Sequence, residues 1–244
     1  ILIRIKKQIN FKRPLSMTAI IIVLAVLMIA SLVISGVVYT RQQALAQRES
    51  HTKHLKQNFQ ETEHIFNFIM KVDDQPDIAI ALHNQLLDLA HQLLKINKKS
   101  EEFQSLFGRL KAQAAELKEG TLKPRGEQTV ANDTMLQKNS TLLNATGQRL
   151  SRLKVRGLLP VAQYEEHLSH LKKLVFTIEY DSHMAMADKQ IEDNNIVKAI
   201  DHLKHARDTL KKTRADIEDK NGKIKTLSDH IQCLLREGQL AQAV

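Results

Sequence analysis

The sequence predicts an all-α protein in which a single N-terminal transmembrane helix precedes an extracytoplasmic helical bundle and coiled-coil region. Three observations predict it: a long uncharged segment near the N-terminus, a composition rich in helix formers, and apolar residues at helical spacing. The chain has 244 residues, with 8 Gly, 4 Pro, no Trp and 4% aromatic residues. Because β-sheets usually need more aromatic, β-branched and turn residues, this composition favours helices.

The uncharged segment covers residues 17–39, "MTAIIIVLAVLMIASLVISGVVY". An α-helix rises about 1.5 Å per residue, so about 20 apolar residues cross a hydrocarbon core of about 30 Å. The few hydroxyl groups in the segment can bond back to the helix backbone. The sequence therefore predicts a transmembrane anchor at 17–39.

The charges around this segment predict its orientation. Residues 1–16 hold five cations and no acidic residue: Arg4, Lys6, Lys7, Lys12 and Arg13. Since the positive flank stays inside, residues 1–16 are expected to be a cytoplasmic tail of a single-pass inner-membrane protein, with the C-terminal part in the periplasm. A cleaved signal peptide is the alternative, but its apolar region is only about 7–15 residues long. The length of 17–39 favours an uncleaved anchor.

The positive charge of the chain does not point to nucleic acid. The net charge is +9, and five of those charges precede the apolar segment. Later cations are mixed with acidic residues and form no basic stripe with interleaved aromatic residues, the pattern expected of a nucleic-acid surface. We therefore expect no nucleic-acid partner.

Residues 41–119 are predicted to be a helical bundle region. No Gly or Pro interrupts residues 41–72, which we expect to continue the anchor helix as a stalk. Pro76 marks a break before a second helix at 78–97. Ser100 is a suitable N-cap for a third helix at 101–119.

Residues 120–128 contain two Gly and one Pro, and we interpret them as a linker. A second helical region is expected over 129–244. It begins with helices at about 129–155 and 160–193, and it contains a heptad coiled-coil segment at 196–234. That segment has apolar residues at every seventh position: Ile196, Leu203, Leu210, Ile217, Ile224 and Ile231.

Sustained heptads are typical of helices packed at 3.5 residues per turn. The companion positions are weak in the middle of the segment, where Thr213 and Lys220 stand. This favours packing within a bundle, or a loose coiled coil, over a tight dimeric zipper. Asn221-Gly222 is expected to cost the helix about 1 kcal/mol or to break it into a hairpin.

The eleven histidines prompt a search for a metal site. Three pairs lie three residues apart, so that each pair shares a helix face: His51/His54, His167/His170 and His202/His205. Zinc needs three or four converging ligands, and the sequence shows no such set. We therefore predict surface histidines, with no metal-ligating, cofactor-binding or catalytic residues. A pH response of the histidines is the remaining alternative.

Catalytic motifs are also missing from the sequence. Glu61-x-x-His64 has the spacing used in di-iron bundles, but such sites need two copies of the motif. Nucleophile elbows, phosphate-binding loops and zincin motifs do not occur. We therefore expect no enzyme activity. The single cysteine, Cys233, is expected to be a buried thiol on a helix core face, with an intermolecular disulfide as the alternative.

Two functional interpretations follow. The first is a membrane-anchored scaffold or interaction protein whose helical faces bind another protein or a second copy of itself. The alternative is the extracytoplasmic input region of a truncated sensor resembling a chemoreceptor or histidine kinase. Such a sensor needs a second transmembrane helix, and no later segment approaches 18 apolar residues.

Overall fold

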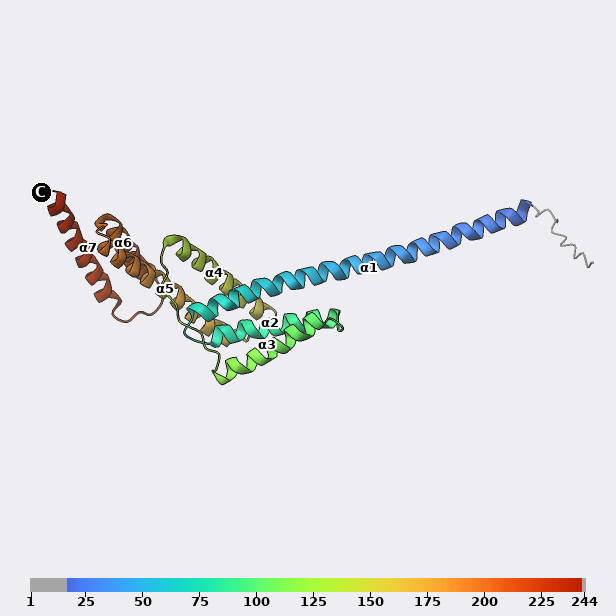
Figure 1. Ribbon diagram of the computed structural model, residues 1–244, viewed down its shortest axis with the longest axis horizontal. Helices are drawn as coiled ribbons and strands as arrows, with labels where there is room; N and C mark the ends of the chain where they lie inside the picture. The colour runs from blue at the N-terminus through green and yellow to red at the C-terminus, as the bar shows by residue number, and fades with distance from the viewer. Residues whose placement is uncertain (1–16, 243–244) are drawn as a thin grey trace, which may run out of the picture. The chain divides into compact units, whose positions relative to one another are not determined.

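A computed structural model describes the backbone of residues 17–242, and the side chains within it except at 17–21, 23, 25, 26, 29, 30, 33 and 237–242. Helices are the only regular secondary structure in the described chain, which confirms the predicted all-α class (Figure 1). Its helices are α1 (Met17–Val72), α2 (Asp77–Ile96), α3 (Glu101–Glu119), α4 (Asp133–Val155), α5 (Val161–Glu192), α6 (Ile196–Lys212) and α7 (Lys220–Gln242).

Local sequence signals explain several of the helix ends. The Ser100 hydroxyl accepts a hydrogen bond from the backbone N–H of Phe103, which confirms the predicted N-cap of α3. The Asn132 side chain caps α4 in the same way through the N–H of Met135. Gly120 ends α3 in the left-handed conformation, with φ of 71°, a region that glycine enters without steric cost.

The chain divides into two compact units, residues 1–53 and residues 54–244. The predicted cytoplasmic tail, residues 1–16, lies outside the described residues. In the first unit the described large apolar side chains of α1 are exposed, for example Met28 at 69% and Leu32 at 71%. Within the part of the chain that the structure describes, no helix meets the length and apolarity needed to cross a bilayer. The anchor at 17–39 therefore stays a prediction.

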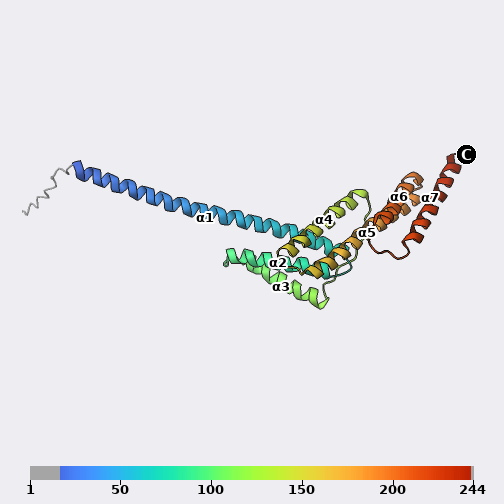
Figure 2. The ribbon, with the colours of Figure 1, turned by 180° about the vertical axis from the view of Figure 1, so that it is seen from behind.

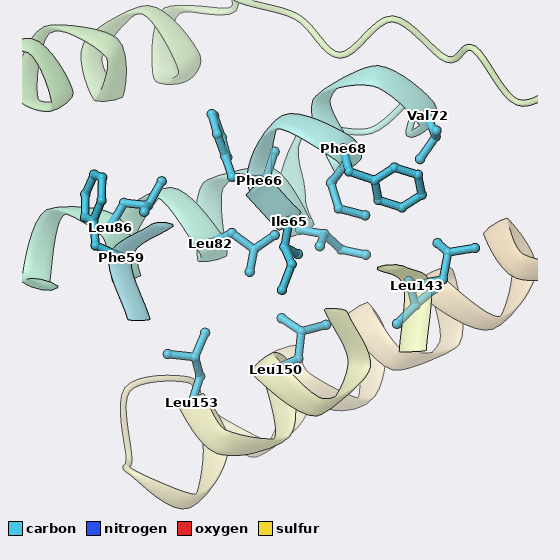
Figure 3. Close-up of a cluster of buried hydrophobic side chains, with 14 of the residues drawn as sticks. Phe59, Ile65, Phe66, Phe68, Val72, Leu82, Leu86, Leu143, Leu150 and Leu153 are labelled. Carbon is cyan, nitrogen blue, oxygen red and sulfur yellow. The ribbon is translucent and has the colours of Figure 1, made fainter. Parts of the chain in front are cut away.

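The second unit is a helical bundle, as predicted, with a large apolar core. Side chains from α1, α2 and α4 point toward one another in this core (Figure 3). Its most deeply buried residues include Ile69, Ile78, Leu82 and Leu150, each fully buried. Removing such side chains from water is the main favourable contribution to folding, about 1.5–3 kcal/mol for each.

The same core extends across the segment predicted as a linker. Residues of α4 and α5, including Leu143 and Ile178, belong to one cluster with those of α1 and α2. Residues 120–128 are not helical, but they are tied to the end of α1: the N–H groups of Arg125 and Gly126 donate to the carbonyls of Met70 and Asp73. Because the predicted division at 120–128 rested on composition alone, it could not include these tertiary contacts.

A second core lies among α5, α6 and α7, where α6 packs against both neighbouring helices (Figures 1 and 2). The heptad residues Leu203, Leu210 and Ile231 are buried in it. Ala199 and Ala206, at companion positions, are also fully buried, and their small side chains let α5 and α6 approach closely. The heptad therefore packs within the bundle, which is one of the alternatives that the sequence left open, and the predicted segment 196–234 is divided between α6 and α7.

The break between α6 and α7 comes earlier in the chain than the sequence predicts. The non-helical segment is 213–219, and Asn221-Gly222 lies in the first turn of α7. Gly222 donates its N–H to the carboxylate of Asp219, and a Cβ at position 222 would collide with that carboxylate. Gly222 therefore helps to start α7 rather than to end the preceding helix.

The cysteine is also placed differently. Cys233 is exposed, whereas its neighbours Ile231 and Leu234 are buried. The prediction of a buried thiol was wrong because "HIQCLL" offers apolar residues on more than one face of the helix, and Ile231 and Leu234 occupy the core face.

Candidate functional site

Three arrangements in the second unit bring polar side chains together in ways that could carry a function. They are a buried Asp–His pair at the end of α1, a groove beside α2, and a histidine cluster between α5 and α6. The sequence predicted no site residues, because it does not show which residues far apart in the chain lie close together in the fold.

The buried pair joins Asp73, just after α1, to His170 on α5. The Nε2 atom of His170 lies 2.7 Å from Oδ1 of Asp73, whose side chain is fully buried. The same oxygen accepts the N–H of Gln75 at 3.1 Å. The hydrogen bond to Asp73, together with nearby acidic groups, raises the pKa of His170 against the opposing effect of burial. The pair therefore favours a charged imidazolium bonded to a carboxylate.

This pair connects the end of α1 to α5. Asp74 lies close enough to complete a group of three possible ligands with Asp73 and His170. The separation of 2.7 Å between Nε2 and Oδ1 is typical of a hydrogen bond to a charged group. Asp73 also accepts the N–H of Gly126 through its backbone carbonyl. Asp73 thus holds the end of α1, the 120–128 segment and α5 together.

A similar connection joins α1 to α4. The guanidinium of Arg149, whose side chain is 6% exposed, donates to Glu61 at 3.2 Å. Burial and the nearby cations Arg152 and Arg156 lower the pKa of Arg149, while Glu61 raises it. Glu61, which has the spacing of a di-iron motif with His64, forms this ion pair with Arg149 in the structure.

The groove lies between α2 and the turn that joins α4 to α5. It encloses about 350 Å³. Its apolar lining consists of Ile80, Ala81, Leu153, Leu158 and Leu159. Three acidic residues also line it, namely Asp77, Asp88 and Glu166. The groove therefore combines an apolar lining with negative charge.

Two buried polar side chains line the same groove. Gln85 is 5% exposed, and its Oε1 has no hydrogen-bond partner among the described residues. A buried acceptor without a donor costs about 1–3 kcal/mol, so it marks a place where a donor from outside would bind favourably. Burial lowers the pKa of His167 despite the nearby Asp77 and Glu166, which favours a neutral ring there.

The histidine cluster joins three helices. His183 on α5 and His202 on α6 place their Nδ1 atoms 3.3 Å apart. The ring of His205 stacks on that of His183, with ring centroids 5.1 Å apart. Asp133, in the first turn of α4, has a carboxylate oxygen within 4.8 Å of a ring nitrogen of both His183 and His202.

The sequence revealed part of this cluster and missed the rest. The predicted pair His202/His205 does share a helix face, but the residue that it meets is His183, on the preceding helix. The prediction that no ligand set converges considered one helix at a time. The available signal was the position of the histidines on their helix faces. If α5 and α6 pack side by side, the face of α6 that carries His202 and His205 can meet His183 on α5.

Comparison with known proteins finds no matching family model, no similar curated protein and no similar solved structure.

Proposed function

We propose that this chain is a membrane-anchored interaction protein. In this proposal residues 17–39 hold the protein in the inner membrane, and the helical body on the periplasmic side binds a segment of another protein. The observation that carries the proposal is the groove beside α2.

The chemistry of the groove selects the kind of partner. Its apolar lining suits the apolar face of an amphipathic helix, a common mode of peptide recognition. The carboxylates of Asp77, Asp88 and Glu166 favour Lys or Arg on the polar face of that segment. An N–H or O–H donor on the segment would satisfy Oε1 of Gln85. The expected partner segment is therefore apolar and basic.

The exposed apolar surface of α1 supports the anchor. Large side chains there, such as Leu27 at 60% and Leu32 at 71%, would face water in a soluble protein. Exposed large apolar side chains of this kind mark a contact with a membrane or another protein. The uncharged sequence of 17–39 and the cations before it favour a membrane with the body on the outer side.

Photo-crosslinking in intact cells tests the groove. A photoreactive residue at Asn84, an exposed residue lining the groove, should join the full chain to a defined partner. The matched control carries the same residue at Lys111, an exposed position on α3 outside the groove. We expect the product from position 84 alone, and we expect Asp88→Lys to reduce it severalfold by repelling a basic segment.

The crosslinked peptide then identifies the occupant. A peptide with apolar residues and Lys or Arg at helical spacing supports the proposal. The same products from positions 84 and 111, or no product from position 84, would contradict it. A peptide from a second copy of this chain would show that the groove binds another copy of the protein, and would contradict a different protein as the partner.

A further inference from the structure

We propose that Asp133, His183 and His202 form a binding site for a divalent transition-metal ion, with Zn²⁺ as the representative ion. One carboxylate oxygen and two imidazole nitrogens lie within 4.8 Å of one another. The residues come from the start of α4 and from the adjacent helices α5 and α6. The inference is independent of the groove and of the membrane anchor.

The spacing of the ligand atoms fits such an ion. Zn²⁺ binds imidazole nitrogen and carboxylate oxygen at about 2.0–2.2 Å, so two ligand atoms in a tetrahedral site lie about 3.4 Å apart. The Nδ1 atoms of His183 and His202 are 3.3 Å apart. The two nitrogens therefore already have the separation that one shared ion requires. Two imidazoles and one carboxylate also make up a ligand set that zinc uses widely.

Packing holds the backbone of the three ligand residues in place. The N–H of Val130 donates to the hydroxyl of Ser182, which is fully buried, at 3.1 Å. This bond fixes the chain just before α4 next to the residue that precedes His183. On the other side, close packing of α5 on α6 sets the distance between the two histidine backbones. The backbone of all three residues is therefore in place for an ion to bind, and the exposed side chain of Asp133 would complete the ligand set.

His205 supports the site without joining the ligand set. Its ring stacks on that of His183, with 19° between the ring planes, which restricts rotation of His183. Three protein ligands leave one position of a tetrahedral ion for water. An ion bound in this way would tie the start of α4 to the α5–α6 pair.

Calorimetric titration of Zn²⁺ into the full chain tests the proposal. The chain is purified in detergent with a tag that contains no histidine, and it is stripped with EDTA and dialysed. We expect saturable binding of one equivalent. Asp133→Asn keeps the size of an exposed side chain and should weaken binding at least about tenfold, as should His202→Ala. The matched control, His51→Ala with His54→Ala, removes an exposed pair on α1 and should leave the affinity unchanged.

A second measurement distinguishes the built site from surface histidines. Co²⁺ bound to the full chain should give the visible absorption of a low-coordinate ion with nitrogen ligands, and Asp133→Asn should change that spectrum while the helical circular dichroism stays the same. Two results would overturn the proposal: no saturable binding of one equivalent, or an affinity lowered by the His51/His54 variant and untouched by Asp133→Asn and His202→Ala.

Discussion

Replacing His170 with alanine is expected to lower the free energy of unfolding by about 3–5 kcal/mol, because it leaves a buried carboxylate without its cationic partner. Asp73 is fully buried, and its Oδ2 already has no hydrogen-bond partner among the described residues. Once His170 is gone, the N–H of Gln75 is the one donor that Oδ1 keeps within the described part of the chain. Chemical unfolding of the full chain measures the loss. His64→Ala, which removes an exposed histidine on α1, is the matched control and should change stability by less than about 0.5 kcal/mol.

The effect of this substitution should depend on pH. The hydrogen bond to Asp73 raises the pKa of His170 in the folded protein above its unfolded value. A raised histidine pKa contributes stability that is fully present below the unfolded pKa, about 6.5, and is lost as the pH rises through the higher folded value. The difference in unfolding free energy between wild type and His170→Ala should therefore be larger at about pH 5.5 than at about pH 8.5.

Comparison of wild type with the variant matters because other histidines oppose this trend. Burial lowers the pKa values of His83, His167 and His183, so these residues favour folding at higher pH. The contributions of His83 and His183 cancel when the variant is subtracted from wild type. The contribution of His167 cancels only in part, because the charge on His170 also lowers the pKa of His167, and this coupling opposes the expected difference. A difference that stayed constant over this pH range, or grew toward high pH, would contradict the charged pair.

Replacing Leu203 with alanine is expected to cost about 2–5 kcal/mol, the range for removing a large apolar side chain from a closed core. Leu203 is fully buried between α6 and its neighbours. Val197, on the same helix, is 69% exposed, so Val197→Ala serves as the matched control and should have little effect. Thermal and chemical unfolding of both variants measure the difference.

The same pair of variants tests where the heptad packs. If Leu203 packs within the core formed by α5, α6 and α7 of one chain, the loss of stability should not depend on protein concentration. If the heptad were an assembly surface between chains, Leu203→Ala would instead weaken an oligomer, and the unfolding midpoint would rise with concentration. The structure predicts the first behaviour.

Sequence patterns were sufficient for the helices and insufficient for their contacts. The bounds of α3 agree with those predicted, Glu101–Glu119, because Ser100 and Gly120 provide local capping signals at its two ends. The heptad residues are buried as their period indicates, but the period does not specify which helix covers them. The break at 213–219 contains neither Gly nor Pro, so no local signal marked it.

The candidate sites were hidden for a related reason. Asp73 and His170 are 97 residues apart, and only the bundle brings them together. His183 and His202 are 19 residues apart on two helices, so a search along one helix face could not pair them. Helical periodicity predicts the face on which a residue lies, whereas a site depends on which two faces meet.

The membrane anchor is tested most directly by alkaline carbonate extraction of cell membranes that contain the full chain. We expect the wild-type chain to stay in the membrane pellet. Leu27→Arg with Leu32→Arg should release it into the soluble fraction, because a central arginine costs about 2.5–3.5 kcal/mol in a transmembrane helix. Ala44→Arg with Ala46→Arg, beyond residue 39, adds the same charges and should leave the chain in the pellet. Release of the wild-type chain, or equal retention of both double variants, would contradict an anchor at 17–39.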